Sequence, residues 1–144
     1  MIKKMSDKHK ILSKYIKDLS SETRDIETFL FVKDNISKYQ LNIDITSKAL
    51  KNKHVEIDTI FKFRDSNESE KKSYFEMTYT SVIKLNKEIE DKTILQKIIL
   101  CDVQKEIYPD IEKALLNLLH TSGYPNIKFE KKVDFEELYN QKFN

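Results

Sequence analysis

The chain has 144 residues, the length of one ordinary domain, and its 26 basic and 24 acidic residues leave a net charge of +2. This near balance gives little support to nucleic-acid binding, which usually shows as a one-sided basic excess. A single glycine excludes the glycine-rich loops that bind phosphates and dinucleotides, and a single cysteine, Cys101, excludes an internal disulfide.

The N-terminus has five lysines within fourteen residues but no apolar segment of the kind found in signal peptides. We interpret residues 1–14 as a flexible, solvated tail and residues 15–144 as one domain. No apolar stretch approaches the roughly 18 residues that a membrane helix needs, and the lone cysteine fits a reducing compartment. We therefore expect a cytoplasmic protein without membrane insertion.

Four segments alternate apolar and polar residues as β-strands do. They are 15–22, 39–50, 54–63 and 73–85. The mixed segment 23–37 is interpreted as a long crossover loop after the first strand. The last three strands are joined by short polar connections, 51–53 and 64–72, which predicts an antiparallel meander.

The alternation also predicts which residues share a face. In the first strand, Ile16 is expected on the same face as Asp18 and Glu22, with Tyr15 and Leu19 on the other face. We expect large apolar groups on the side of the sheet that no helix covers, namely Ile16, Ile60, Tyr74 and Val82. Exposed apolar area of this kind marks an interface or a binding groove, so we expect an oligomer, an apolar binder, or both.

The second half of the chain changes to helical spacing. Pro109 is expected to be the first residue of a new helix that ends near Gly123, because proline is favoured at helix starts and glycine just past helix ends. That helix carries a broad apolar stripe, Ile111, Ala114, Leu115, Leu118 and Leu119. Asp134 and Glu137 predict a capped last helix over 134–143. Strands followed by helices indicate an α+β fold, a four-stranded antiparallel sheet with C-terminal helices on one face.

No catalytic or metal-binding constellation is found. The three histidines, His9, His54 and His120, lack metal-ligand spacing, and Cys101 has no CxxC partner. Carboxylates are scattered, and there is no GxSxG nucleophile motif. Aromatic residues interleaved with lysines are explained as ordinary strand faces rather than as a base-stacking platform. We therefore expect no enzyme, no metal, no cofactor and no nucleic-acid partner.

Several segments, taken in order, resemble the SecB family of bacterial protein-export chaperones. They are YIKDLS at 15–20 followed by Glu22, FVKD at 31–34, YFEMTYTSVI at 74–83, and YP, SGYP and VDFEELY between 108 and 139. The resemblance runs in register from about Ile11 to Gln141. It implies a four-stranded antiparallel sheet with a long crossover loop and helices on one face. It also implies a homotetramer, a dimer of dimers, that holds unfolded preproteins and passes them to the ATPase SecA without using ATP.

The resemblance also implies sites. The SecA-binding surface would comprise Asp18, Glu22, Tyr74 and Glu76, although a shift of one residue would bring Met77 to the position of Glu76. The client groove would include Phe29 and Phe31 of the crossover loop and Phe135, Leu138 and Tyr139 of the last helix. The tetramer interface would include Ile111, Leu115, Leu118 and Leu119.

The chain departs from the family pattern at several positions. Ser81-Val82-Ile83 replaces a glycine-containing segment, Asn35 stands where many relatives have tryptophan, and Val103-Gln104 replaces Cys-Pro. Many relatives are also acidic, whereas this chain is not. An alternative function is therefore a SecB-like chaperone dedicated to one partner, such as the antitoxin of a toxin–antitoxin system.

Overall fold

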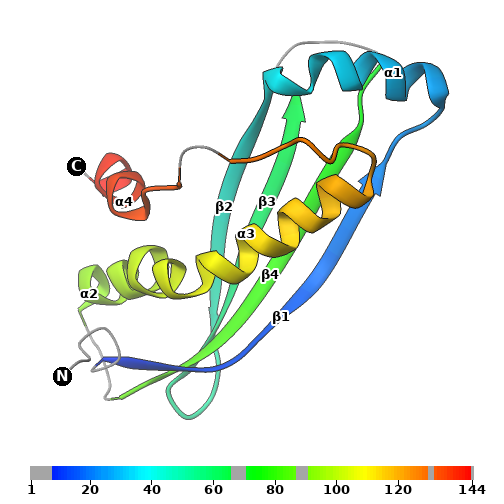
Figure 1. Cartoon of the computed structure of the whole chain (residues 1–144). Helices are drawn as coiled ribbons and strands as arrows, with labels where there is room; N and C mark the ends of the chain where they lie inside the picture. Colours follow the sequence, from blue (N-terminus) through cyan, green and yellow to red (C-terminus); the bar gives the residue numbers. More distant parts are fainter. Residues whose placement is uncertain (1–7, 66–70, 87–90, 130–131, 144) are drawn as a thin grey trace.

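The computed structural model describes residues 8–65, 71–86, 91–129 and 132–143. Within them, one antiparallel sheet has the strand order β1-β4-β3-β2. Its strands are β1 (His9–Glu22), β2 (Tyr39–Ala49), β3 (His54–Asp65) and β4 (Tyr74–Leu85). The long helix of the C-terminal half crosses one face of this sheet, and the other face stays open (Figure 1). The predicted α+β fold is confirmed.

Strands β2, β3 and β4 begin and end within two residues of their predicted bounds. Along β3, Val55, Ile57 and Phe61 are buried beneath the helices, and the residues between them face the open side. Asn52 and Lys53, with φ of 60° and 64°, close the β2–β3 hairpin. Positive φ at both positions matches the right-handed twist of the paired strands, so this tight turn fixes their register.

Strand β1 begins at His9, six residues earlier than predicted. Residues 9–14, assigned by sequence to a flexible tail, therefore belong to the sheet, and residues 1–7 lie outside the described chain. His9 is fully buried, and its Nε2 lies 2.5 Å from the Glu106 carboxylate of the long helix. This contact between a buried histidine and a partly exposed carboxylate joins the start of the edge strand to the helix layer.

A bulge at Lys17 reverses the alternation of β1. Ile16 lies opposite Tyr79 on the helix-covered face, whereas Asp18 lies opposite Thr78 on the open face. The prediction that Ile16 shares a face with Asp18 is therefore wrong. A bulge inserts one unpaired residue, so the alternation of side chains between the two faces of the sheet shifts by one residue across it.

The crossover after β1 is a helix rather than the expected loop. Helix α1 (Ile26–Asn35) begins where the Asp25 carboxylate accepts the Thr28 amide at 2.8 Å. It is followed by a short 3-10 turn, η2 (Ile36–Lys38). The helix buries only Thr28 and Val32, which is why its sequence shows no clean apolar period.

Pro109 lies inside a helix and does not start one. Helix α2 (Lys92–Lys97), the π-helical turn η3 (Ile98–Asp102) and helix α3 (Val103–Thr121) follow one another without a break. Proline lacks the amide that would bond the Lys105 carbonyl, but Pro109 is exposed, so water can satisfy that carbonyl. The predicted helix start is therefore wrong.

The buried Gln104 supports the π-helical turn. Its Nε2 donates to the Ile99 carbonyl at 3.1 Å, and its Oε1 accepts the Thr59 hydroxyl at 2.9 Å. The wider turn interrupts the regular backbone hydrogen-bond pattern of the α-helix, and the glutamine side chain satisfies one carbonyl there. It also joins the helix to the middle of β3.

The core lies between α3 and the sheet. Ile111, Leu115 and Leu119 are at most 1% exposed and pack on the inner face of the strands. At the start of helix α4 (Phe135–Phe143), the Asp134 carboxylate accepts the Glu137 amide at 3.0 Å, as predicted. In the described part of the chain, no helix is both long enough and apolar enough to cross a membrane.

Replacing Gly123 with alanine is expected to destabilise the fold by roughly 1–3 kcal/mol, measured by urea unfolding. Gly123 has φ +115°, and a Cβ there would lie 2.6 Å from an atom of the Phe29 ring. The double variant Gly123→Ala/Phe29→Ala removes the steric contact and keeps the backbone strain. An unchanged unfolding midpoint for Gly123→Ala would contradict this account.

Candidate functional site

A groove runs along the β2 edge of the sheet and is lined on its other side by residues 123–129 and 132–134, between α3 and α4. It comprises two cavities of about 480 and 990 Å³. Both cavities are lined by Ser37, Tyr39, Lys128 and Phe129, so they adjoin each other. The first extends to the C-terminal end of α1, and the second extends to α4, which lies beyond the β2 edge (Figure 1).

The groove has a rigid aromatic wall. The Tyr39 ring packs on Phe63 with ring centroids 5.4 Å apart, and Phe63 meets Phe129 at 5.9 Å. The Tyr39 hydroxyl exchanges hydrogen bonds with the Ser73 backbone, accepting its amide at 3.0 Å. Because these rings hold one another in place, the apolar surface is pre-formed, as in most binding pockets.

The groove exposes the backbone edge of β2. This strand ends the sheet order, so within the described chain its outer edge has no strand partner. The consecutive residues Leu41, Asn42 and Ile43 all line the second cavity. Successive side chains of a strand point to opposite faces, so a cavity that reaches all three also reaches the strand edge. An extended peptide could pair there through main-chain hydrogen bonds.

The α4 end of the groove is held by an ion cluster and a ring contact. The Glu136 carboxylate binds Lys105 at 3.0 Å and Lys97 at 3.4 Å, and these hydrogen bonds lower the pKa of Glu136. Phe135 packs edge-on against Tyr108 at 5.5 Å. Burial, with the nearby Glu112 carboxylate, raises the pKa of Tyr108 to about 12, so this phenol of the groove wall stays neutral.

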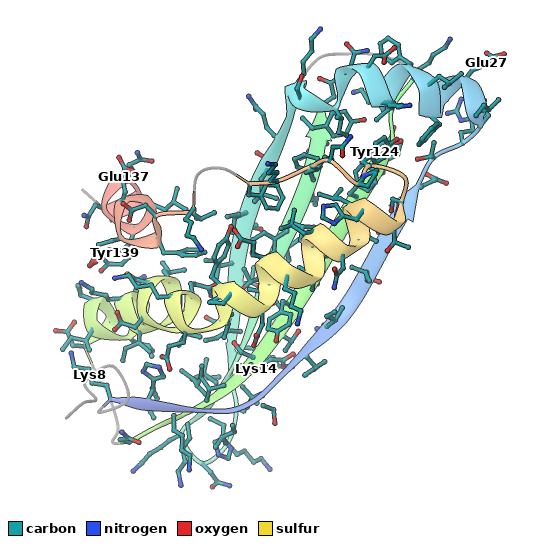
Figure 2. All side chains as sticks on the ribbon, in the orientation of Figure 1. Lys8, Lys14, Glu27, Tyr124, Glu137 and Tyr139 are labelled. Carbon is teal, nitrogen blue, oxygen red and sulfur yellow. The ribbon has the colours of Figure 1, made fainter. Side chains whose placement is uncertain are left out.

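Of the five predicted groove residues, Leu138 lines the second cavity. Phe135, the first residue of α4, is buried, and the Tyr139 hydroxyl donates to the Thr93 carbonyl at 3.5 Å. Phe29 packs against Tyr124 with ring centroids 5.4 Å apart. Tyr124 lies between the C-terminal end of α3 and α1 (Figure 2). Phe31, which is 38% exposed on α1, lines neither cavity.

Sequence reasoning missed most of the groove. The missed lining residues include Tyr39, Leu41, Ile43, Phe63, Ile127, Phe129 and Val133. The available signal was the alternation of Ile127 and Phe129 in an extended segment, which predicts one apolar face. Its partners on β2 and β3 are more than sixty residues away in the sequence, so the cavity itself had no local signal.

The four predicted SecA-binding residues lie together on the open face. Glu22 is directly opposite Tyr74, Glu76 is opposite Ser20, and Asp18 is opposite Thr78. Cross-strand neighbours of this kind have Cβ atoms about 5 Å apart. We call Asp18, Glu22, Tyr74 and Glu76 the acidic patch. The register also settles which residue of β4 faces outward, because Met77 is fully buried under the helices.

The predicted tetramer stripe is mostly core. Ile111, Leu115 and Leu119 are covered by the sheet of their own chain, so they have no surface for a second copy. Leu118 is partly buried and is the member of the stripe that keeps accessible area. The larger apolar surface lies on the edge strand β1, where four side chains are 43–48% exposed, namely Leu12, Tyr15, Ile16 and Leu19.

Among the described residues, neither the groove nor the acidic patch gathers side chains suited to covalent or metal chemistry. Among the described residues, no three histidine, cysteine or carboxylate side chains are grouped so that they could hold a metal ion. Cys101 is fully buried, and burial raises the pKa of its thiol, which disfavours the nucleophilic thiolate.

Comparison with known proteins agrees with this architecture. Residues 3–144 match the family model described as preprotein translocase subunit SecB. A relative from Pelagibacter ubique (strain HTCC1062), provisionally named protein-export protein SecB, is 56% identical over 97% of this chain and 100% of its own length. The protein-export protein SecB of Bradyrhizobium sp. (strain BTAi1) is 23% identical over 91% of this chain and 79% of its own.

A solved structure shares the fold. It is a SecB-like chaperone of Mycobacterium tuberculosis in complex with a peptide from an antitoxin, with a TM-score of 0.66. The likeness covers 90% of this chain and 93% of the other at 9% identity, so it concerns the fold alone.

Proposed function

This chain belongs to the SecB family, and we propose that it is an ATP-independent holdase that binds unfolded preproteins and delivers them to the SecA translocase. The family is one of chaperones rather than enzymes. The observation that carries the proposal is the groove, an aromatic-walled cavity that runs along an unpaired strand edge.

The groove suits unfolded chains for a physical reason. Main-chain hydrogen bonds to the β2 edge do not depend on sequence, and the apolar cavities accept many large side chains. Only an unfolded client can offer a free extended strand together with exposed apolar groups. Binding to the unfolded state alone delays folding by mass action, without nucleotide hydrolysis.

Delivery to SecA would use the acidic patch. The patch lies on the β1–β4 half of the open face, whereas the groove lies at the β2 edge, at the other side of the sheet. The two surfaces do not overlap, so a client and SecA could be bound at the same time. We place this activity in the cytoplasm, before preproteins are exported.

We further propose that the chain works as a homotetramer, a dimer of dimers. An edge strand as long as β1, with apolar side chains on both of its faces, is an aggregation hazard unless another copy covers it. Leu118 on α3 offers a second contact. Several copies would also bring several grooves to one client, which raises avidity.

A SecB-like chaperone dedicated to one partner is the second candidate. A structural neighbour binds a peptide from an antitoxin, and a single groove type could serve either a broad or a narrow set of clients. The two candidates differ in SecA binding, which the export function requires and the dedicated function does not.

The proposal is tested by adding the protein to a chemically unfolded preprotein diluted into refolding buffer. We expect refolding to slow at stoichiometric amounts, equally with and without ATP, and native mass spectrometry to find a tetramer with bound client. A monomer that leaves refolding unchanged would refute the holdase.

Leu138→Gln is expected to weaken client binding about three- to tenfold with little change in thermal stability. The side chain is 43% exposed and lines the second cavity, so its loss removes apolar contact area from the groove. Leu50→Gln is the matched control, because Leu50 is 39% exposed and lies near the β2–β3 hairpin, away from the groove. Equal effects of the two variants on client titrations would argue against the groove.

A further inference from the structure

The groove carries unequal charge along its length. Among the described residues, Lys33 and Lys128 are the charged ones that line the first cavity. The second cavity adds Lys132, Asp134 and Glu137, so carboxylates enter only toward α4. The α1 end of the groove is therefore cationic.

The two lysines of the first cavity also lack an ion-pair partner within the described part of the chain. Lys132 lies 3.9 Å from the Glu112 carboxylate, and Asp134 already accepts the Glu137 amide at the α4 cap. Neither Lys33 nor Lys128 makes an ion pair with any other residue that the structure describes.

Unpaired lysines in an aromatic groove favour acidic ligands. Their aliphatic stems can lie along the apolar wall while the ammonium groups stay at the rim in water. A segment that fills the cavity removes part of that water, which costs free energy unless the segment brings an anion. A basic segment would add repulsion to the same cost.

We propose that the α1 end of the groove selects extended client segments in which an aromatic or large aliphatic side chain is flanked by aspartate or glutamate. This inference rests on the proposed holdase function and names its preferred client chemistry. Lys33 and Lys128 are the specificity-determining residues, and the shared aromatic wall receives the apolar side chain.

The anionic partner is a peptide rather than a nucleic acid. The rings of Tyr39, Phe63 and Phe129 contact one another at tilted and edge-on angles, so they do not form a row of parallel platforms for successive bases. The unpaired β2 edge beside them matches a peptide main chain, whose donors and acceptors alternate as in a strand.

The test uses the full-length protein and fluorescent peptides that share one apolar core. The flanks are aspartate, glutamine or lysine, placed at either end in turn, and affinity is measured by anisotropy. The better aspartate peptide is expected to bind about tenfold more tightly than its lysine counterpart, which two partly exposed ion pairs can supply. The preference should shrink as salt rises to about 0.5 M.

The double variant Lys33→Gln/Lys128→Gln is expected to abolish the charge preference, read as the ratio of the affinities of the aspartate and lysine peptides, whether or not the affinity for the glutamine peptide also changes. Lys113→Gln is the control, because Lys113 is exposed on α3 and lines neither cavity.

Three results would overturn the inference. The aspartate and lysine peptides could bind equally, or the preference could survive in the double variant. A single-stranded oligonucleotide could also displace the aspartate peptide through the same lysines, which would assign the site to nucleic acid. Failure of every peptide to bind, with no slowing of refolding, would reject the holdase function as well. Binding of the glutamine peptide without charge preference would reject only this inference.

Discussion

Leu115→Asp is expected to unfold the protomer, whereas Leu118→Asp is expected to divide the proposed tetramer into smaller units that stay folded. Leu115 is 1% exposed, so an unpaired carboxylate there should lower the free energy of unfolding by roughly 3–5 kcal/mol. Leu118 keeps accessible surface that a second copy can cover. Native mass spectrometry reports the size of the assembly, and urea unfolding reports the stability of each variant.

Asn117→Asp provides the control, because it adds the same charge to the exposed face of α3. If Leu118→Asp unfolds the chain as Leu115→Asp does, the stripe is only core. If Leu118→Asp keeps an intact tetramer, the contact lies elsewhere. Ile16→Asp then tests β1, because Ile16 is 43% exposed on the helix-covered face of this edge strand.

Charge reversal of the acidic patch is expected to weaken binding to SecA at least about hundredfold. The variant is Asp18→Lys/Glu22→Lys/Glu76→Lys. Loss of three attractive charges at about 1 kcal/mol each accounts for this factor, and repulsion from the new lysines adds to it. Client affinity should not change, because the groove lies at the β2 edge of the sheet. Surface plasmon resonance with SecA, repeated at higher salt, measures the loss.

Asp44→Lys is the matched control for this experiment. Asp44 is an exposed acid on the same open face, but it lies on β2, beyond β3 and away from the patch. An unchanged SecA affinity for the triple variant, or an equal loss for Asp44→Lys, would show that the patch is not the binding surface. Absence of any SecA binding by the wild type would favour the dedicated-partner alternative.

Local periodicity predicted the strands where one face of the sheet is covered. Along β3, buried residues alternate with open-face residues almost throughout, and the bounds of β2, β3 and β4 were correct to within two residues. The cap at Asp134 was also readable, because it depends on side chains only three residues apart. These features rest on contacts between near neighbours.

Three elements escaped that reasoning. The bulge at Lys17 changes the facing of Ile16 without any mark in the residue pattern. Helix α1 rests on one cap and two buried residues, and the helix through Pro109 continues because the proline is exposed and the flanking turns pack on the sheet. In each case, tertiary contacts override local propensity.

The candidate sites divide in the same way. The resemblance to the SecB family identified the acidic patch, and the β1–β4 register brings its four residues to one face. The groove was largely missed, and of the five residues predicted for it only Leu138 lines either of its two cavities. Its wall joins Tyr39, Phe63 and Phe129 from three separate elements.

By itself, the sequence determined the α+β order of elements, the alternating faces of the meander and the family, because these depend on residues close together in the chain. Only the tertiary structure decided where the groove lies, which lysines in it are unpaired and which apolar residues remain for a second copy. Those properties depend on contacts between segments distant in sequence, and burial removes a side chain from the surface only after the sheet and α3 have packed together.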